Sequence, residues 1–395
     1  MPNPQARPDY SLEDPAFWEK IRKAYDWEAE PFDLTDEEGI RGLLDLVRMH
    51  YGEVDEAYPE YLRWEYSDNP AGRAIIWVAR HNRRIVGQYV INPVRMKLGA
   101  MVREGSLAIK VLTHRDFREK GIYPYLAGKA FAACRQKNIV LTYGFPNSVI
   151  SKESLAQLGY RYIGSPGLWI KPLSAKNLLR RCAKDNLFMF FLGLPALSFL
   201  GVYDFFLHKF NNSGKGDSGR INVRIVREFD RRFDDLWQRA QSCHKNIIVR
   251  DSAYLNWRYI KNPRRSYVIL AAEDSGKKIV GYTVLRIASF DTLKAGYIVD
   301  LLAEKSCAGR LALSLLIKGA LAHFRKNGAD IAGFLVSPDR AYSGVLLKNG
   351  FFICPERFRP QPYNFVLRNH SPEIPEEDVL RFRDWFITFG DNDVV

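Results

Sequence analysis

The sequence is poor in cysteine and lacks the spacings through which cysteine usually builds structure. Its five cysteines are odd in number, lie far apart and never form a C-x-x-C pair. Neither a disulfide framework nor a zinc site is therefore expected, and we predict no metal cofactor. The N-terminal "MPNPQARPDYSLEDP" has no charged stretch followed by an apolar core, so we expect no secretory signal and a cytoplasmic protein.

Blocks of like charge are also missing. The 395 residues include 58 Lys+Arg and 45 Asp+Glu, a net charge of +13 with no run of five like charges. A positive balance suits an anionic partner, such as a nucleotide cofactor, a nucleic acid or an acidic membrane surface. Because neither a basic stripe nor a nucleic-acid-binding motif is present, we expect no DNA partner and favour an anionic cofactor.

The chain is instead rich in apolar residues and contains an internal repeat. Apolar residues make up 47% and aromatic residues 13%, enough for a large core and two or three domains. The stretch "YLRWEYSDNP" at 61–70 returns as "YLNWRYIKNP" at 254–263, with six of ten positions identical and starts 193 residues apart. The spacing has the size of a domain and predicts two copies of one module. Trp64 and Trp257 are expected to pack a helix on a sheet, with the lining of an acceptor cleft as the alternative.

Both halves show the same order of predicted elements. The first half has a helix after Thr35, whose spacing to Glu38 fits a capping box, and then two strands that form a hairpin over 74–96. A third strand, a helix over 124–138, another strand and a short helix that ends at Gly159 follow. The second half repeats this order with offsets near 190 residues. Antiparallel strands followed by a strand–helix–strand unit predict an α+β fold with a mixed, mostly antiparallel sheet in each module.

These patterns predict four regions. The first module covers 30–170, an apolar insert and linker cover 171–219, the second module covers 220–370, and 371–395 form a C-terminal tail. The uncharged stretch 187–203 is short for a membrane span and contains Pro195. It is expected to form a buried interdomain hairpin or to lie on a bilayer surface. The tail is expected to fray, or to present Asp391 and Asp393 to a cationic acceptor.

The segment "VLTHRDFREKGIYPYLAGKAF" at 111–131 carries the strongest functional signal. A strand ends, a short polar loop with Arg118 and Gly121 follows, and a helix starts at once. Such a junction directs backbone N–H groups and the positive end of the helix dipole at one spot, which suits a phosphate. Gly121 would let the backbone approach an anion closely. The alternative is an ordinary strand–loop–helix connection without a ligand.

This segment resembles the GNAT superfamily of acyl-CoA-dependent N-acyltransferases. In that family an Arg/Gln-x-x-Gly-x-Gly/Ala loop at a helix start holds the pyrophosphate of the coenzyme. Arg118, Gly121 and Tyr123 stand at the three pattern positions, and Tyr123 departs from the small residue expected there. The stretch "YGFPNSVISKESLAQLGY" resembles the next strand, an Asn-containing turn and a helix that ends in Gly-aromatic. The resemblance covers most of the chain as a tandem pair.

The resemblance implies roles for individual residues. Backbone N–H groups near Val111 and Leu112 would bind the oxyanion, and Asn147 would contact the pantetheine arm or the following helix. The pyrophosphate would lie against the loop formed by Arg118, Glu119, Lys120, Gly121, Ile122 and Tyr123. The second module keeps Gly309 but has Ser306 and Leu311 at the other pattern positions, so it is expected to be a degenerate partner.

The general acid of the family is not found at its usual position. It is often a tyrosine four residues before the Gly-aromatic pair, where this chain has Leu155. Candidate replacements are Tyr143, His114 and Glu104, and each also has an ordinary structural interpretation.

The expected protein is an N-acyltransferase that uses acetyl-CoA or another acyl-CoA and a small-molecule amine acceptor. Amino-sugar or polysaccharide precursors are one class of acceptor, and polyamines, antibiotics or protein amines are others. Contact of 187–203 with the inner face of the membrane would favour the first. Two alternatives remain: a Fem-like transferase that uses aminoacyl-tRNA, and a non-catalytic GNAT scaffold. The oligomeric state is left open.

Overall fold

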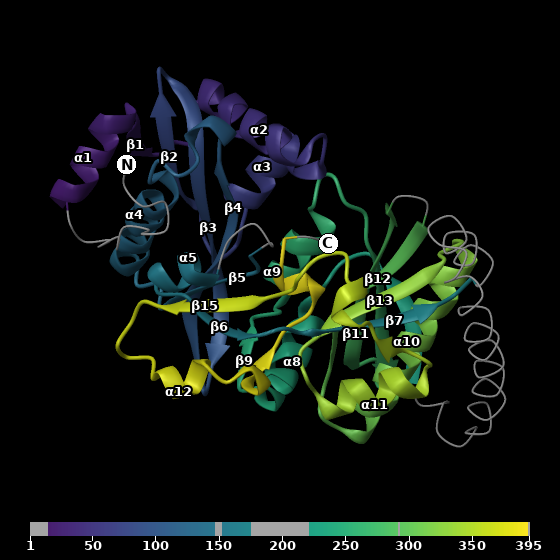
Figure 1. The fold of residues 1–395 in the computed structure, drawn as a ribbon. Coiled ribbons are helices and arrows are strands. Elements are labelled where there is room, and N and C mark those ends of the chain that lie inside the picture. Colours follow the sequence, from purple (N-terminus) through teal and green to yellow (C-terminus); the bar gives the residue numbers. More distant parts are fainter. Residues whose placement is uncertain (1–14, 147–151, 175–220, 291–292, 394–395) are drawn as a thin grey trace. The chain divides into compact units, whose positions relative to one another are not determined.

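The computed structural model describes residues 15–146, 152–174, 221–290 and 293–393. Asn147 and the insert 187–203 lie outside these described residues. Contacts divide the chain into two compact units, which Figure 1 shows coloured along the sequence. Unit 1 consists of Met1–Gly164, Lys261–Arg265 and Gln361–Arg381, and unit 2 consists of Ser165–Ile260, Ser266–Pro360 and Phe382–Val395.

Unit 1 is built on a mixed sheet with the strand order β1-β2-β3-β4-β5-β15-β6. All neighbours in this order are antiparallel except β4 and β5, which run parallel. The strands are β1 (Glu28–Pro31), β2 (Ile75–His81), β3 (Arg84–Leu98), β4 (Met101–Thr113), β5 (Leu141–Gly144), β6 (Arg161–Gly164) and β15 (Phe365–Asn369).

Helices cover both faces of this sheet. Figure 1 shows α2 and α3 on one face and α4 on the other. The core between α4 and the sheet contains Tyr89, Ile91, Leu126 and Phe131. The helices are α1 (Pro15–Tyr25), α2 (Glu37–Tyr51), α3 (Pro59–Tyr66), α4 (Ile122–Gln136), α5 (Lys152–Gln157) and α12 (Glu376–Val379), with short 3₁₀ turns η1 (Asp55–Ala57) and η2 (Arg115–Phe117).

The start of α2 differs from the predicted capping box. Asp36, and not Thr35, is the N-cap residue, and its carboxylate accepts a hydrogen bond of 2.8 Å from the N–H of Gly39. Aspartate satisfies a first-turn donor as well as threonine does and adds a negative charge at the positive end of the helix. The prediction of a helix here is confirmed, but its predicted cap is wrong by one residue.

Unit 2 repeats this architecture. Its sheet has the order β14-β7-β13-β12-β11-β10-β8, and β12 and β13 are the parallel pair. Its strands are β7 (Gly167–Pro172), β8 (Ile221–Val226), β10 (Val268–Asp274), β11 (Ile279–Phe290), β12 (Leu293–Ala303), β13 (Ile331–Val336) and β14 (Phe352–Ile353), with β9 (Asn246–Ile248) pairing β16 (Trp385–Phe386). Its helices are α8 (Arg231–Ala240), α9 (Ser252–Leu255), α10 (Cys307–Lys326) and α11 (Arg340–Lys348), and short turns are η4 (Gln241–Cys243), η5 (Asn256–Ile260), η6 (Glu356–Phe358), η7 (Phe382–Asp384) and η8 (Phe389–Asp391).

The two units confirm the α+β class, and the strands of their sheets follow the same order. The repeated stretches are both helical, although the first is the α-helix α3 and the second continues from α9 into the π-type turn η5. Trp64 is 3% exposed and Trp257 is 5% exposed, so both are core residues.

One strand in each unit comes from the other half of the chain. β15 lies between β5 and β6 in unit 1, and β7 lies between β13 and β14 in unit 2. The four sequential regions that we predicted do not include this exchange.

Candidate functional site

The loop before α4 has the backbone conformation of an open helix start. Glu119 and Gly121 both have positive φ, 63° and 74°. Gly121 is the N-cap residue of α4 and has no side chain with which to cap it. The N–H groups of Ile122 and Tyr123 belong to the first turn and have no partner within the helix, whereas Pro124 has no N–H. The loop therefore combines two first-turn donors with Arg118, whose side chain is exposed.

The N-terminal helix α1 supports this loop. A Cβ atom on Gly121 would lie 2.9 Å from Cγ2 of Ile21 and 3.1 Å from Cζ3 of Trp18. The indole N–H of Trp27 donates to the carbonyl oxygen of Lys120 over 3.1 Å. The positive φ and the packing of α1 thus require glycine at 121 without any ligand. This gives Gly121 a structural reason beside the close approach of an anion that the sequence suggested.

Tyr123 does not obstruct the loop. Its ring stacks on that of Tyr89 with centroids 6.1 Å apart and an interplanar angle of 21°. Burial raises the pKa of the Tyr123 hydroxyl above its ordinary value. The large residue at the third pattern position therefore packs against the core.

Strand β4 contains a bulge next to this loop. Gln88 pairs with Leu112 but Val90 pairs with Ile109, so Lys110 and Val111 together face Tyr89. Lys110 has a positive φ of 46°, which is costly for a residue with a side chain. A bulge leaves one backbone group outside the ladder. Such a group at Val111 is what the expected oxyanion donor requires.

The parallel pairing of β4 with β5 is short. It joins Ser106 to Thr142 and Leu107 to Tyr143, and the described part of the chain has no further pair between these strands. β4 continues for six residues beyond Leu107, to Thr113. Tyr143 stands at the end of this pairing, is 1% exposed, and packs beside Phe145 and Phe365.

The three candidate catalytic residues lie on different parts of the sheet. Glu104 lies seven positions before Val111 on the extended strand β4, on the order of 20 Å away. Glu104 pairs with Arg95, and partial burial raises its pKa. Tyr143 is on β5, and His114 follows β4.

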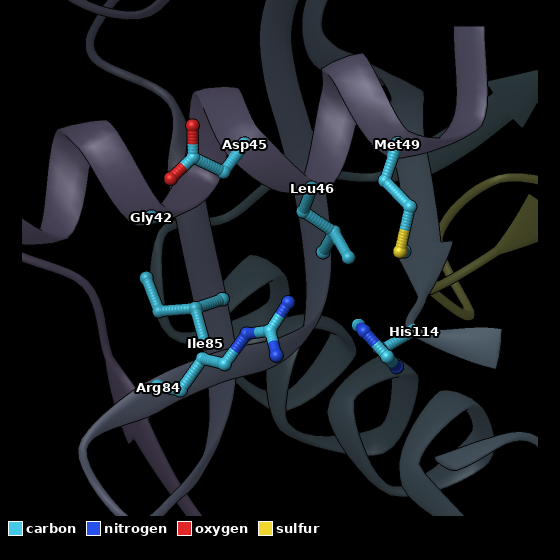
Figure 2. A pocket seen from close by; sticks show the side chains of 7 residues that line it. All are labelled: Gly42, Asp45, Leu46, Met49, Arg84, Ile85 and His114. Atoms are coloured by element: carbon cyan, nitrogen blue, oxygen red, sulfur yellow. The ribbon is translucent and has the colours of Figure 1, made fainter. Parts of the chain in front are cut away.

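His114 lines a small pocket of about 70 Å³ between α2 and the start of β3. Figure 2 shows its imidazole and the guanidinium of Arg84 facing the space below Leu46 and Met49. Partial burial and the nearby Arg84 lower the pKa of His114, which favours the neutral imidazole. This pocket is far smaller than a coenzyme site, which usually has several hundred Å³.

The equivalent helix start in unit 2 is closed by its own side chains. The backbone N–H of Glu304 donates to the carbonyl oxygen of Val280. In unit 1 the N–H of His114 donates to the carbonyl oxygen of Val86 in the same way. Ser306 caps α10 by accepting from the N–H of Gly309 over 2.9 Å, and its hydroxyl donates to Glu304 over 2.9 Å. Burial raises the pKa of Glu304, but hydrogen bonds from Arg239, Ser306 and Lys278 outweigh this and lower it below its ordinary value. A fixed carboxylate therefore stands where unit 1 offers open donors.

The C-terminal segment of the chain packs beside strands β12 and β13 of unit 2. Beyond the β12–β13 pairs, Thr388 bridges Val336, and the hydroxyl of Thr388 donates to Asp300 over 3.2 Å. Arg250 binds Asp391 at 2.7 Å and Asp300 at 3.1 Å, with all three side chains 1% exposed. The described residues 385–391 are buried, and the carboxylate of Asp391 pairs with Arg250. The prediction that Asp391 faces an acceptor is wrong for this residue.

A polar cluster in unit 1 was missed from the sequence. Tyr61, Glu65, Gln88 and Lys110 are each less than a tenth exposed. The alternation of β3 could have placed Gln88 on one face, but the position of Lys110 depends on the bulge, which has no sequence signal.

Within the described ranges, no group of three or more His, Cys, Asp or Glu could hold a metal ion. α10 is the one described helix that is long and apolar enough to cross a membrane, and it is also the core helix of unit 2.

Comparison with known proteins identifies the first module. Residues 32–163 match the model of the acetyltransferase (GNAT) domain family. No curated protein sequence matches the chain.

Three solved structures share the fold of most of the chain. A GCN5-related N-acetyltransferase from Anabaena variabilis ATCC 29413 is 13% identical, with 87% of this chain and 73% of that chain covered and a TM-score of 0.59. N-myristoyltransferase from Saccharomyces cerevisiae with bound myristoyl-CoA is 14% identical, with 89% and 86% covered and a TM-score of 0.58. A probable N-acyltransferase from Enterococcus faecalis V583 is 11% identical, with 87% and 72% covered and a TM-score of 0.57. Residues 32–163 thus match a GNAT acetyltransferase domain, and most of the chain shares the fold of these three structures.

Proposed function

We propose that the protein transfers an acyl group from acyl-CoA, with acetyl-CoA as the first candidate, to a primary amine. The observation that carries the proposal is the open start of α4 beside the β4 bulge. Two first-turn N–H groups, the exposed Arg118 and the positive end of the helix dipole offer an anion site. The bulge at Lys110 and Val111 lies on the strand that leads into this loop.

Different residues of unit 1 have different roles in the proposed reaction. The loop from Arg118 to Tyr123 binds the pyrophosphate through backbone N–H groups, while Arg118 adds positive charge. A backbone N–H at Val111 or Leu112 stabilises the oxyanion that develops on the thioester carbonyl. Asn147 remains a predicted contact of the pantetheine arm.

The reaction conserves atoms and charge. The ammonium group of the acceptor loses a proton, and the free amine nitrogen attacks the thioester carbonyl carbon. A C–N bond forms and the C–S bond breaks, so the products are an amide and coenzyme A thiol, with the released proton passing to solvent. Holding both reactants in one site supplies much of the rate enhancement.

The acyl chain and the acceptor define the finer proposal. Acetyl-CoA follows from the family of the first module, and the bound myristoyl-CoA of one structural neighbour makes a long-chain thioester the second candidate. Amino-sugar or polysaccharide precursors remain the first class of acceptor.

Calorimetric titration with acetyl-CoA and myristoyl-CoA tests the proposal. The wild type is compared with Arg118→Glu, which reverses one exposed charge at the loop. Lys305→Glu is the matched control, because Lys305 is exposed in the equivalent loop of unit 2.

We expect micromolar binding of one thioester, at least tenfold weaker binding by Arg118→Glu and no change with Lys305→Glu. Weakening by Lys305→Glu alone would move the coenzyme to unit 2. If neither thioester binds, the proposal is wrong, and salt-sensitive binding of tRNA would then support the Fem-like alternative.

A further inference from the structure

A buried polar region lies on the face of the unit 1 sheet that α2 and α3 cover. Successive residues of a strand point to opposite faces. Tyr89 and Ile91 pack in the core with α4, so Gln88 and Asn92 point toward α2 and α3. Tyr61 contributes to this side from α3 and is fully buried.

The region is organised around Lys110 at the bulge. The amide nitrogen of Gln88 donates to the carbonyl oxygen of Lys110 over 3.0 Å. The ammonium group of Lys110 lies 3.8 Å from Glu56. Arg265 binds Glu56 at 2.6 Å and stacks 5.2 Å above the centre of the Tyr61 ring. A continuous set of contacts thus links the strained strand residue to helix α3.

Three oxygen atoms in this region have no hydrogen-bond partner in the described part of the chain. They are Oη of Tyr61, Oε1 of Gln88 and Oδ1 of Asn92, and their residues are 0%, 2% and 5% exposed. The bond from Gln88 to the Lys110 carbonyl fixes which amide atom is the oxygen. Buried polar groups are almost always paired, so three unpaired acceptors on one face indicate a missing donor.

The chemistry of the region specifies that donor. Burial raises the pKa of Tyr61 above its ordinary value, with the charge of Glu65 as the next cause. Glu65 lies one turn after Tyr61 on α3 and is 2% exposed. A primary ammonium group has three donors, no acceptor and a positive charge. It therefore complements unpaired oxygen atoms beside a buried carboxylate.

We propose that Tyr61, Glu65 and Gln88 form a binding site for the ammonium group of the acceptor. Its role in transfer rests on the proposed function, because the site adjoins the strand expected to bind the thioester carbonyl. The site accounts for the unpaired oxygen atoms of Tyr61 and Gln88, and it adjoins the strained backbone of Lys110. It also selects amines over alcohols of the same size, since an alcohol supplies one donor and no charge.

Ligand-observed NMR titration of the full chain with propylammonium chloride tests the site, with 1-propanol as the neutral analogue at constant ionic strength. The variants are Tyr61→Phe, which removes only the unpaired hydroxyl, and Glu65→Gln, which removes the charge. Tyr58→Phe is the matched control, because Tyr58 stands at the start of the same helix and packs 3.7 Å from Arg264. Thermal unfolding and binding of acetyl-CoA are measured on every variant.

We expect saturable binding of propylammonium and none of propanol, with binding weakened at least fivefold in Tyr61→Phe and tenfold in Glu65→Gln. Tyr61→Phe should unfold at the same temperature as the wild type or higher, since it loses a buried unpaired group; a purely structural hydroxyl would not weaken amine binding. Equal binding of propanol, or full binding by Tyr61→Phe, would overturn the site. Failure of acetyl-CoA to bind the wild type would overturn the proposed function instead, and the amine titration would still decide this inference.

Discussion

Removal of Arg250 should destabilise unit 2 more than any surface substitution. The guanidinium neutralises Asp300 and Asp391, donates to the carbonyl of Ile248 over 2.8 Å and contacts Thr388. Arg250→Met keeps most of the side-chain volume but leaves two buried carboxylates without their cation. Breaking one partner of a buried ion pair costs about 3–5 kcal/mol. For a unit of this size, that lowers the unfolding temperature by roughly 10 °C.

The effect of Arg250→Met should also depend on pH. Burial raises the pKa of Asp391 above its ordinary value, even though Arg250 opposes the rise. A carboxyl group with a raised folded-state pKa contributes stability below its unfolded pKa of about 4 and loses it as the pH rises through the folded value. Without Arg250 this pKa rises further. The deficit of the variant should therefore be largest near pH 8 and smaller near pH 5.

The assay is urea unfolding followed by tryptophan fluorescence, because Trp385 is 2% exposed in this segment. Arg224→Met is the control, since Arg224 pairs with Glu273 but its side chain is 43% exposed. It should cost at most about 1 kcal/mol. A loss below 1 kcal/mol in Arg250→Met, or a deficit that grows toward pH 5, would refute the reasoning.

Two further predictions concern backbone packing and a buried histidine. Gly309→Ala places a Cβ 1.9 Å from the backbone oxygen of Glu304, whereas the Cβ of Gly121→Ala meets side-chain atoms of Ile21 at 2.9 Å and Trp18 at 3.1 Å and requires a positive φ. Thermal unfolding should show a loss of more than about 3 kcal/mol for the first and about 1–2 kcal/mol for the second, and the reverse order would contradict this explanation. Burial lowers the pKa of His370 to about 3. The contribution of its neutral imidazole to the stability of the folded protein is therefore lost as the pH falls below the unfolded-state pKa of about 6.5. The wild type should lose about 2 kcal/mol between pH 7 and 5 from this group, and His370→Asn should remove that part of the slope in urea unfolding.

The duplicated fold could be predicted because its signals are local. The repeated Tyr-Leu-x-Trp-x-Tyr-x-x-Asn-Pro stretch and the alternation of the strands depend on neighbouring residues. The Asn-Pro turn is an example: Oδ1 of Asn69 accepts from the N–H of Ala71, and α3 ends at Tyr66. Asn262 makes the same kind of turn with Arg264. Side chains that bond their own backbone leave a readable pattern.

The exchange of strands could not be predicted, since it depends on partners far apart in the chain. β15 pairs with β5, where Leu367 lies opposite Tyr143. No local feature of "NFVLRN" indicates that this strand pairs with β5 and not with a strand of the second half of the sequence. The orientation of Tyr123 was missed for a similar reason: the loop pattern gives its position, but only the packing against Tyr89 shows that the ring turns inward.

The contrast between the units explains why the functional region could be predicted only in part. In unit 2, Ser306 caps the start of α10 and Asp300 pairs with Arg250. Thr388 forms a β-bridge with Val336, at the end of β13 beyond its parallel pairs with β12. In unit 1 the equivalent helix start has Gly121, and Lys110 stands at the bulge. Sequence comparison of the two loops showed the first difference, because it lies in one motif. The second difference, Lys110 at the bulge of unit 1 against the Asp300–Arg250 pair of unit 2, depends on which buried side chains contact each other. Those contacts are visible only in the folded structure. If unit 1 binds the coenzyme, as proposed, the same architecture caps its helix start with Ser306 in unit 2 and leaves it without a side-chain cap at Gly121 in unit 1.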